Sequence, residues 1–161
     1  MTFDFQGKKI LVMGLGLHGG GVETVRFFAS RGAVVTVTDL RSEKELESSL
    51  LKLKQISGIS YVLGRHRDSD VLQADLIVKN PGVPPTSPFL MLARKHTIPV
   101  TTDLGIFLRQ CPALIVGVTG TRGKSTTCFL ISRFLEECSD LLIFRGIFYP
   151  HAAKMMLIKA V

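Results

Sequence analysis

The sequence predicts an α/β fold: a Rossmann-like parallel sheet with flanking helices, followed by an incomplete P-loop strand–loop–helix unit. Two observations support this prediction. Apolar runs of strand length alternate with longer amphipathic stretches, which is typical of βαβ units and of a mostly parallel sheet. In addition, two glycine-rich loops, about a hundred residues apart, each follow a predicted strand and precede a predicted helix.

The first half of the fold is predicted from hydrophobic spacing and helix-end signals. The expected elements, in order, are a strand at 10–13, a glycine turn at 14–21, a helix at 22–30, a strand at 33–38, a helix at 42–55 and a strand at 59–63. Val22, Val25 and Phe28 share one face of the first helix, and Gly32 follows as a C-terminal glycine. Ser42 is a capping residue for the second helix.

The second half contains more turns and ends in a new unit. The expected elements are a strand at 75–79, a loop at 80–88, a helix at 88–95, a strand at 98–101, a helix at 104–110, a strand at 113–118, a glycine loop at 119–124 and a helix at 125–137. We therefore expect one domain over 1–111, the start of a second over 112–138, and an atypical tail over 139–161. The tail is either an unrelated segment or an amphipathic helix that covers an exposed sheet edge.

Composition restricts the functional classes. The chain has 161 residues, 46% of them hydrophobic, which suits one well-buried domain and excludes a disordered chain. Its three cysteines are too few for a disulfide scaffold, and they are expected to be small buried side chains. The net charge is +7, but the basic residues are scattered, so no nucleic-acid partner is predicted. Neither a membrane span nor a signal peptide is visible, and we expect a cytoplasmic protein.

The first glycine loop reads Gly14-Leu-Gly16-Leu-His-Gly19, and Asp39 follows Gly19 by 20 residues. Glycines let the backbone turn sharply and bring N–H groups and a helix N-terminus against a diphosphate, although a purely structural turn also tolerates them. Asp39 is either a ligand for a ribose or a solvated strand end. Arg41 either pairs with an anionic or uracil-bearing group or is an ordinary exposed arginine. A stand-alone NAD-binding regulatory module is one hypothesis that uses this loop.

The second loop reads Gly117-Val-Thr-Gly120-Thr-Arg-Gly123-Lys124-Ser125-Thr126. It departs from the strict Walker A string because Val118 stands five positions before Gly123. The chemistry still fits a triphosphate. Gly120 and Gly123 free the backbone to wrap phosphates, Lys124 reaches the β- and γ-oxygens, and the Ser125 hydroxyl faces Mg²⁺.

Together with Asp39-Leu-Arg41, Asn80-Pro-Gly-Val83 and the segment around Asp103, these two loops resemble the Mur ligases of bacterial peptidoglycan synthesis, in particular the group that adds D-glutamate. The resemblance covers about residues 5–137. It implies an ATP-dependent ligase that phosphorylates the carboxylate of UDP-N-acetylmuramoyl-L-alanine. The amine of D-glutamate then attacks the acyl phosphate to form an amide.

The resemblance also implies which residues bind each substrate. Those implied for the UDP substrate are Gly14, Gly16, Leu17, His18, Gly19, Asp39, Arg41, Asn80 and Gly82. Those implied for ATP are Gly120, Thr121, Arg122, Gly123, Lys124, Ser125 and Thr126. Lys124 is the implied catalytic residue, and Ser125 is the implied Mg²⁺ contact through ATP.

Three features depart from the family pattern. Arg122 stands where the family usually has asparagine, and Gly105 stands where an acid is common in the segment around Asp103. In addition, the sequence after Glu137 does not match the expected remainder of the ATPase domain. We therefore expect the chain to be an amino-terminal fragment that binds a UDP-sugar weakly and is inactive. His66, His96 and His151 have no partners at metal-ligand spacing and are expected at the surface.

Overall fold

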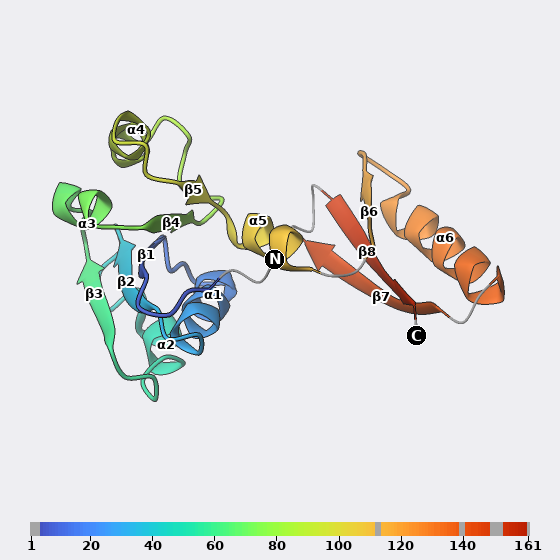
Figure 1. Cartoon of the computed structure of the whole chain (residues 1–161), viewed down its shortest axis with the longest axis horizontal. Coiled ribbons are helices and arrows are strands. Elements are labelled where there is room, and N and C mark those ends of the chain that lie inside the picture. Colours follow the sequence, from blue (N-terminus) through green and yellow to red (C-terminus); the bar gives the residue numbers. More distant parts are fainter. Residues whose placement is uncertain (1–3, 112–113, 139–140, 149–152, 161) are drawn as a thin grey trace. The chain divides into compact units, whose positions relative to one another are not determined.

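The computed structural model describes residues 4–111, 114–138, 141–148 and 153–160 (Figure 1). Contacts between Cα atoms divide the chain into two compact units, residues 1–106 and residues 107–161. This boundary does not test the predicted division into 1–111, 112–138 and 139–161, which stays a prediction.

The first unit contains the parallel sheet that the sequence predicts. Its strands are β1 (Lys9–Met13), β2 (Val34–Asp39), β3 (Ile59–Leu63), β4 (Leu76–Lys79) and β5 (Val100–Thr101). They lie in the order β3-β2-β1-β4-β5, and every pairing is parallel. The chain runs from β1 toward β3 on one side and then returns to β4 on the other side of β1. The carboxyl ends of β1, β2 and β4 therefore flank a topological switch point, where open α/β sheets bind ligands.

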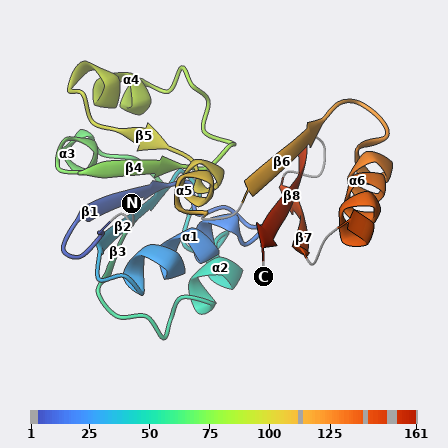
Figure 2. The ribbon, with the colours of Figure 1, turned by 45° about the vertical axis from the view of Figure 1, so that its right-hand side comes forward.

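Helices cover both faces of this sheet (Figures 1 and 2). They are α1 (Gly20–Ala29), α2 (Glu47–Leu51), α3 (Asp68–Leu72), α4 (Pro88–Lys95) and α5 (Asp103–Gln110). One buried cluster joins β1 to side chains of α1 and α5, and a second joins β1 to side chains of α3 and α4.

β1 shows why the sheet is covered on both sides. Ile10 and Val12 belong to the first cluster, whereas Leu11 and Met13 belong to the second. Successive strand side chains point to opposite faces, so a strand that is apolar at every position requires two apolar layers. All four of these side chains are at most 2% exposed, so β1 is the centre of the fold.

Two predicted helical regions differ from the structure. The helix expected at 42–55 is α-helical only over Glu47–Leu51, because the flanking turns close with i→i−3 bonds such as Leu53 N–H to Leu50 C=O, 2.9 Å. The short helix α3 was not predicted, because five residues with one buried side chain, Val71, do not make a detectable period.

The second unit contains β6 (Leu114–Thr119), α6 (Lys124–Cys138), β7 (Leu141–Phe148) and β8 (Ala153–Ala160). The strand and helix on either side of the second glycine loop are confirmed. β8 pairs antiparallel with both β6 and β7, which gives the order β6-β8-β7 (Figure 2). The alternative of a closing amphipathic helix is therefore wrong for residues 141–148 and 153–160, the part of the tail that the structure describes. Two short, mostly apolar segments, one on either side of Pro150 in the sequence, suit strands better than one helix.

Within the described ranges, no helix combines the length and apolar character needed to cross a lipid bilayer.

Candidate functional site

The turn between β1 and α1 depends on its glycines. Gly14 has φ +90°, Gly16 has φ +67° and Gly19 has φ +88°, a region that other residues adopt only with strain. The Gly14 N–H donates to the Thr38 carbonyl at 2.7 Å, which fixes the turn to the end of β2. At Gly21 a Cβ would lie 2.2 Å from the Leu15 carbonyl oxygen, so the turn and α1 are in direct backbone contact.

Asp39 connects this turn to the loop after β2. Its carboxylate accepts the Gly16 N–H at 3.0 Å through Oδ2 and the Arg41 N–H at 2.9 Å through Oδ1. The Arg41 guanidinium lies 3.5 Å from Oδ1. Asp39 is only 3% exposed, so the alternative of a solvated strand end is wrong. Its buried charge is compensated by two backbone donors and one cation, as buried carboxylates require.

The loop after β4 packs against the same glycine turn. The Asn80 N–H donates to the Met13 carbonyl at 2.8 Å, and the Asn80 side chain accepts the Gly82 N–H at 3.0 Å. A Cβ on Gly14 would lie 2.8 Å from the Asn80 Cβ. The Lys79 ammonium donates to the Val83 carbonyl at 2.8 Å, which holds the proline-rich segment in place. The three strand ends therefore form one connected site.

A cleft of about 840 Å³ opens between these loops. All nine residues predicted for the UDP substrate line it except Gly19, which forms the N-cap of α1. The cleft therefore brings together residues from three separate loops. It is also lined by residues that were not predicted, including Glu45, His66, Ser87 and Phe89.

Glu45 gives the cleft a second carboxylate. The Ser42 hydroxyl and N–H both donate to Glu45 Oε2, at 2.7 Å and 2.8 Å. These hydrogen bonds favour the charged form and lower the pKa of Glu45 below its ordinary value. The prediction that Ser42 caps the second helix is wrong, because Leu46 is the N-cap of α2; Ser42 instead organises the turn before α2 through Glu45.

His66 is another cleft residue that the sequence did not predict. It was expected at the surface, but it is half-buried and lines the cleft. Its Nδ1 lies 2.7 Å from Thr38 Oγ1, and its ring meets the ring of Phe89 edge-on at 5.0 Å. Burial lowers its pKa, and the nearby Asp39 charge partly opposes this effect. One signal was available: His66 lies three positions beyond the predicted strand 59–63, at the same sheet edge as Asp39.

The second glycine loop lies in the second unit, between β6 and α6. Gly120 has φ +145° and Gly123 has φ +75°, and a Cβ at Gly123 would meet nothing within 4 Å. The Lys124 ammonium donates to the Gly120 carbonyl at 2.5 Å, so the lysine folds over the loop. Thr121, Arg122, Ser125 and Thr126 are exposed. The geometry thus presents a lysine and a hydroxyl at the start of a 15-residue helix.

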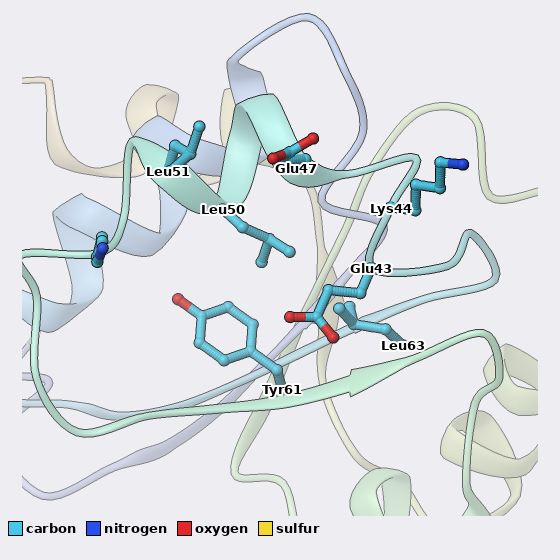
Figure 3. Close-up of a pocket in the computed structure, with 8 residues that line it drawn as sticks. Glu43, Lys44, Glu47, Leu50, Leu51, Tyr61 and Leu63 are labelled. Carbon is cyan, nitrogen blue, oxygen red and sulfur yellow. The ribbon is translucent and has the colours of Figure 1, made fainter.

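A larger hollow of about 940 Å³ lies elsewhere, between α2 and β3 (Figure 3). Leu50 of α2 points toward the ring of Tyr61 on β3, and Glu43 approaches from the preceding turn (Figure 3). Partial burial raises the pKa of the Tyr61 hydroxyl. None of the predicted site residues lines this hollow.

Cysteine, histidine and acidic side chains are the residues that could hold a metal ion. In the part of the chain that the structure describes, no group of three or more His, Cys, Asp or Glu side chains is arranged to hold a metal ion. Cys128 is a buried free thiol and Cys111 is half-buried, whereas the side chain of Cys138 lies outside what is described.

Comparisons with known proteins agree with the architecture of the first unit. Residues 8–102 match the family described as Mur ligase MurD-like, N-terminal domain. The UDP-N-acetylmuramoylalanine--D-glutamate ligase of Roseiflexus sp. (strain RS-1) is 50% identical over 131 residues, which are 81% of this chain and 28% of that protein. The ligase of the same name from Borreliella burgdorferi (strain ZS7) is 44% identical over 135 residues, 83% of this chain and 29% of that protein.

One solved structure with related sequence is a pseudomurein peptide ligase type C from Methanothermus fervidus. It is 29% identical, has a TM-score of 0.46, and is matched over 84% of this chain and 27% of its own length. The chain spans somewhat more than a quarter of the length of the curated relatives named above. Since the family match covers residues 8–102, more than half of the 161, the chain belongs to the MurD-like Mur ligases through its N-terminal domain.

Proposed function

We propose that the cleft binds the UDP part of UDP-N-acetylmuramoyl-L-alanine and that the loop Gly120–Thr126 binds ATP with Mg²⁺. Both sites would serve a cytoplasmic ligase of peptidoglycan synthesis that adds D-glutamate through an acyl phosphate. The observation that carries the proposal is the connected geometry of the glycine turn, Asp39 and the Asn80 loop at the switch point of the sheet. Membership in the MurD-like family supports the choice of substrate.

Different residues of the cleft would contact different parts of the UDP substrate. Leu17 and His18 lie on the turn that leads into α1, where the N-terminal end of the helix favours a diphosphate. Asp39 and Arg41 lie at the end of β2 and would contact the uridine. Asn80 and Gly82 would contact the substrate beyond the diphosphate. Ligand binding at the carboxyl ends of parallel strands supports this arrangement.

The second loop fits a triphosphate by the chemistry of its donors. Lys124 and the backbone of Gly120–Gly123 would contact the phosphate oxygens, and the Ser125 hydroxyl would face Mg²⁺. ATP supplies the phosphoryl group that activates the substrate carboxylate. The role of Lys124 in this step is to neutralise the charge on the transferred phosphoryl group.

We propose further that these 161 residues bind nucleotides but do not form the amide bond. The curated relatives named above are more than three times as long as the matched segment. Acyl transfer requires both reactants to be positioned as well as bound.

The test is calorimetric titration with UDP-N-acetylmuramoyl-L-alanine and, separately, with Mg²⁺-ATP. Arg41→Ala should weaken only the first ligand, and Lys124→Ala only the second, so each variant is the control for the other. A chain that is folded by circular dichroism and gives no heat with the UDP substrate at about millimolar concentration, where even weak binding is detectable, contradicts the proposal.

The alternative, a stand-alone NAD-binding regulatory module, stays a prediction. It requires Asp39 to bind a ribose hydroxyl, and it gives no role to the loop Gly120–Thr126, which favours the ligase instead. The same titration with NADH, followed by its fluorescence, distinguishes the two functions.

A further inference from the structure

The contacts around His66 favour one of its two ring nitrogens as the one that carries the proton. Thr38 Oγ1 donates to the Arg65 carbonyl at 3.0 Å, and a carbonyl can only accept. A hydroxyl has one proton, so Thr38 Oγ1 has none left for His66 Nδ1, which lies 2.7 Å away. Both Thr38 contacts are hydrogen bonds at the same time only if Nδ1 is the donor in the second one. The neutral ring then carries its proton on Nδ1 and a lone pair on Nε2.

The protein holds this ring firmly but leaves Nε2 available. Phe89 packs edge-on against the ring at 5.0 Å, and Thr38 fixes the Nδ1 side. Among the described residues, no hydrogen bond reaches Nε2. The neutral form is favoured, because burial lowers the pKa of His66. His66 is half-buried and lines the cleft, so its unpaired Nε2 acceptor is complementary to a ligand that brings a donor.

We propose that His66 is a specificity-determining residue of the cleft, whose Nε2 accepts a hydrogen bond from an O–H or N–H group of a bound uridine nucleotide. This inference depends on the proposed function of the cleft. It adds a recognition element from the β3–α3 loop, which contains none of the residues implied by the family resemblance. The donor is either a ribose hydroxyl or the imide N–H of the base.

Two substitutions separate the acceptor from the Thr38 contact. The side-chain amide of His66→Asn can replace the Nδ1 donor and keep the bond to Thr38, but it removes the acceptor in the cleft. The longer amide of His66→Gln can place an oxygen near the position of Nε2, but it loses the bond to Thr38. His96→Asn is the matched control, because His96 is exposed and does not line the cleft.

The probe is UDP, titrated by calorimetry into the 161-residue chain and its variants. We expect His66→Asn to weaken UDP about threefold to tenfold, as the loss of one hydrogen bond implies, and His66→Gln and His96→Asn to bind more like the wild type. A purely structural role predicts the reverse order, with His66→Gln impaired and His66→Asn normal. That reverse order, or equal affinity of all variants, overturns the inference.

Modified nucleotides identify the donor. If it is a ribose hydroxyl, 2′-deoxy-UDP should bind the wild type more weakly, whereas His66→Asn should show little further loss. If it is the imide N–H, N3-methyl-UDP should bind the wild type more weakly, and His66→Asn should show little further loss with this nucleotide. Additive losses with both nucleotides overturn the inference, because the variant and the missing donor would then act independently.

The pH dependence gives a further readout. On acidification below the lowered pKa of His66, Nε2 gains a proton and stops accepting, so UDP affinity should fall more steeply in the wild type than in His66→Asn. The other titratable or charged groups that line the cleft are His18, Asp39, Arg41 and Glu45, and both proteins contain them. Equal slopes in the two proteins contradict the inference.

The tautomer can be observed without any ligand. Long-range ¹H–¹⁵N correlation spectra of the imidazole should show Nδ1 protonated and Nε2 unprotonated near neutral pH, and protonated Nε2 overturns the inference.

If the wild type shows the expected tautomer but does not bind UDP, the proposed function of the cleft fails and the inference fails with it. If the wild type binds UDP and His66→Asn binds equally well, only the inference fails.

Discussion

Among the glycines that line the cleft, Gly14 has the least room for a side chain. It combines a left-handed φ of +90° with close contact to Asn80, whose Cβ would lie 2.8 Å from a new Cβ. Real Cβ atoms do not approach this closely, so either the glycine turn or the Asn80 loop must move. Both loops supply residues to the cleft, so strain at this contact should affect stability and binding together.

We therefore predict that Gly14→Ala lowers the free energy of unfolding by about 2–4 kcal/mol, from backbone strain together with overpacking. Gly19→Ala is the matched control. Gly19 has nearly the same φ, +88°, but a Cβ there would meet nothing within 4 Å, so only the strain of about 1–2 kcal/mol remains. Urea unfolding measures both values. Equal losses in the two variants would show that the contact with Asn80 adds no cost.

Asp39 acts as a fixed charged acceptor between two loops. Asp39→Asn has nearly the same shape, but its amide group presents a donor to either the Gly16 or the Arg41 N–H. We expect a loss of about 2 kcal/mol in unfolding free energy, in the range for hydrogen bonds to a charged group. Asp4→Asn is the control, because Asp4 also accepts a backbone N–H, from Gln6, but is exposed. Similar losses from both substitutions would contradict this account of Asp39.

The turn before α2 is organised by the pair Ser42 and Glu45. The Ser42 hydroxyl and N–H hold the Glu45 carboxylate and lower its pKa. We predict that Ser42→Ala raises the pKa of Glu45 toward its ordinary value, since the hydroxyl donor is the largest cause of the shift. The carboxyl carbon followed by NMR through a pH titration measures it. Ser48→Ala, at an exposed position in α2, should leave that pKa unchanged. An unchanged pKa in Ser42→Ala contradicts the assignment.

At the scale of elements, the sequence predicts best where one periodic pattern determines the outcome. β1 and β4 could be predicted because each has apolar side chains at successive positions, and therefore on both faces of the sheet. The helix expected at 42–55 was too long: Leu46 and Leu53 are fully buried as its spacing implies, but turns rather than a continuous helix carry them. Helical spacing identifies the buried face and does not by itself distinguish an α-helix from a series of tight turns.

Only part of the candidate site could be predicted from local sequence patterns. Glycines and the acid at a strand end have local signatures, so the turn at Gly14 and Asp39 could be predicted. The position of His66 after a strand was a signal, but its contacts could not be predicted, because Thr38 is 28 residues away and Phe89 belongs to α4. The pairing of β8 with β6 likewise depends on contacts between distant segments. Local patterns do not contain that information.

At the scale of the whole molecule, both hydrophobic clusters lie within the first unit. Every residue of the two clusters falls between Phe5 and Ile106, and the five-stranded sheet ends with β5 at Val100–Thr101. The apolar surface that stabilises this sheet is therefore buried by residues of the same unit. A unit with its own core should fold without the remainder of the chain.

We therefore predict that a chain ending at Cys111 keeps the fold of the first unit. The backbone amides of β1 should exchange with deuterium as slowly as in the 161-residue chain, because the same residues bury them. A chain ending at Pro99 is the matched control. It loses Val100, which packs on the second cluster, and Ile106, which belongs to the first, so β1 should exchange faster. Rapid exchange of β1 in the chain ending at Cys111 would show that the first unit depends on residues 112–161 for its stability.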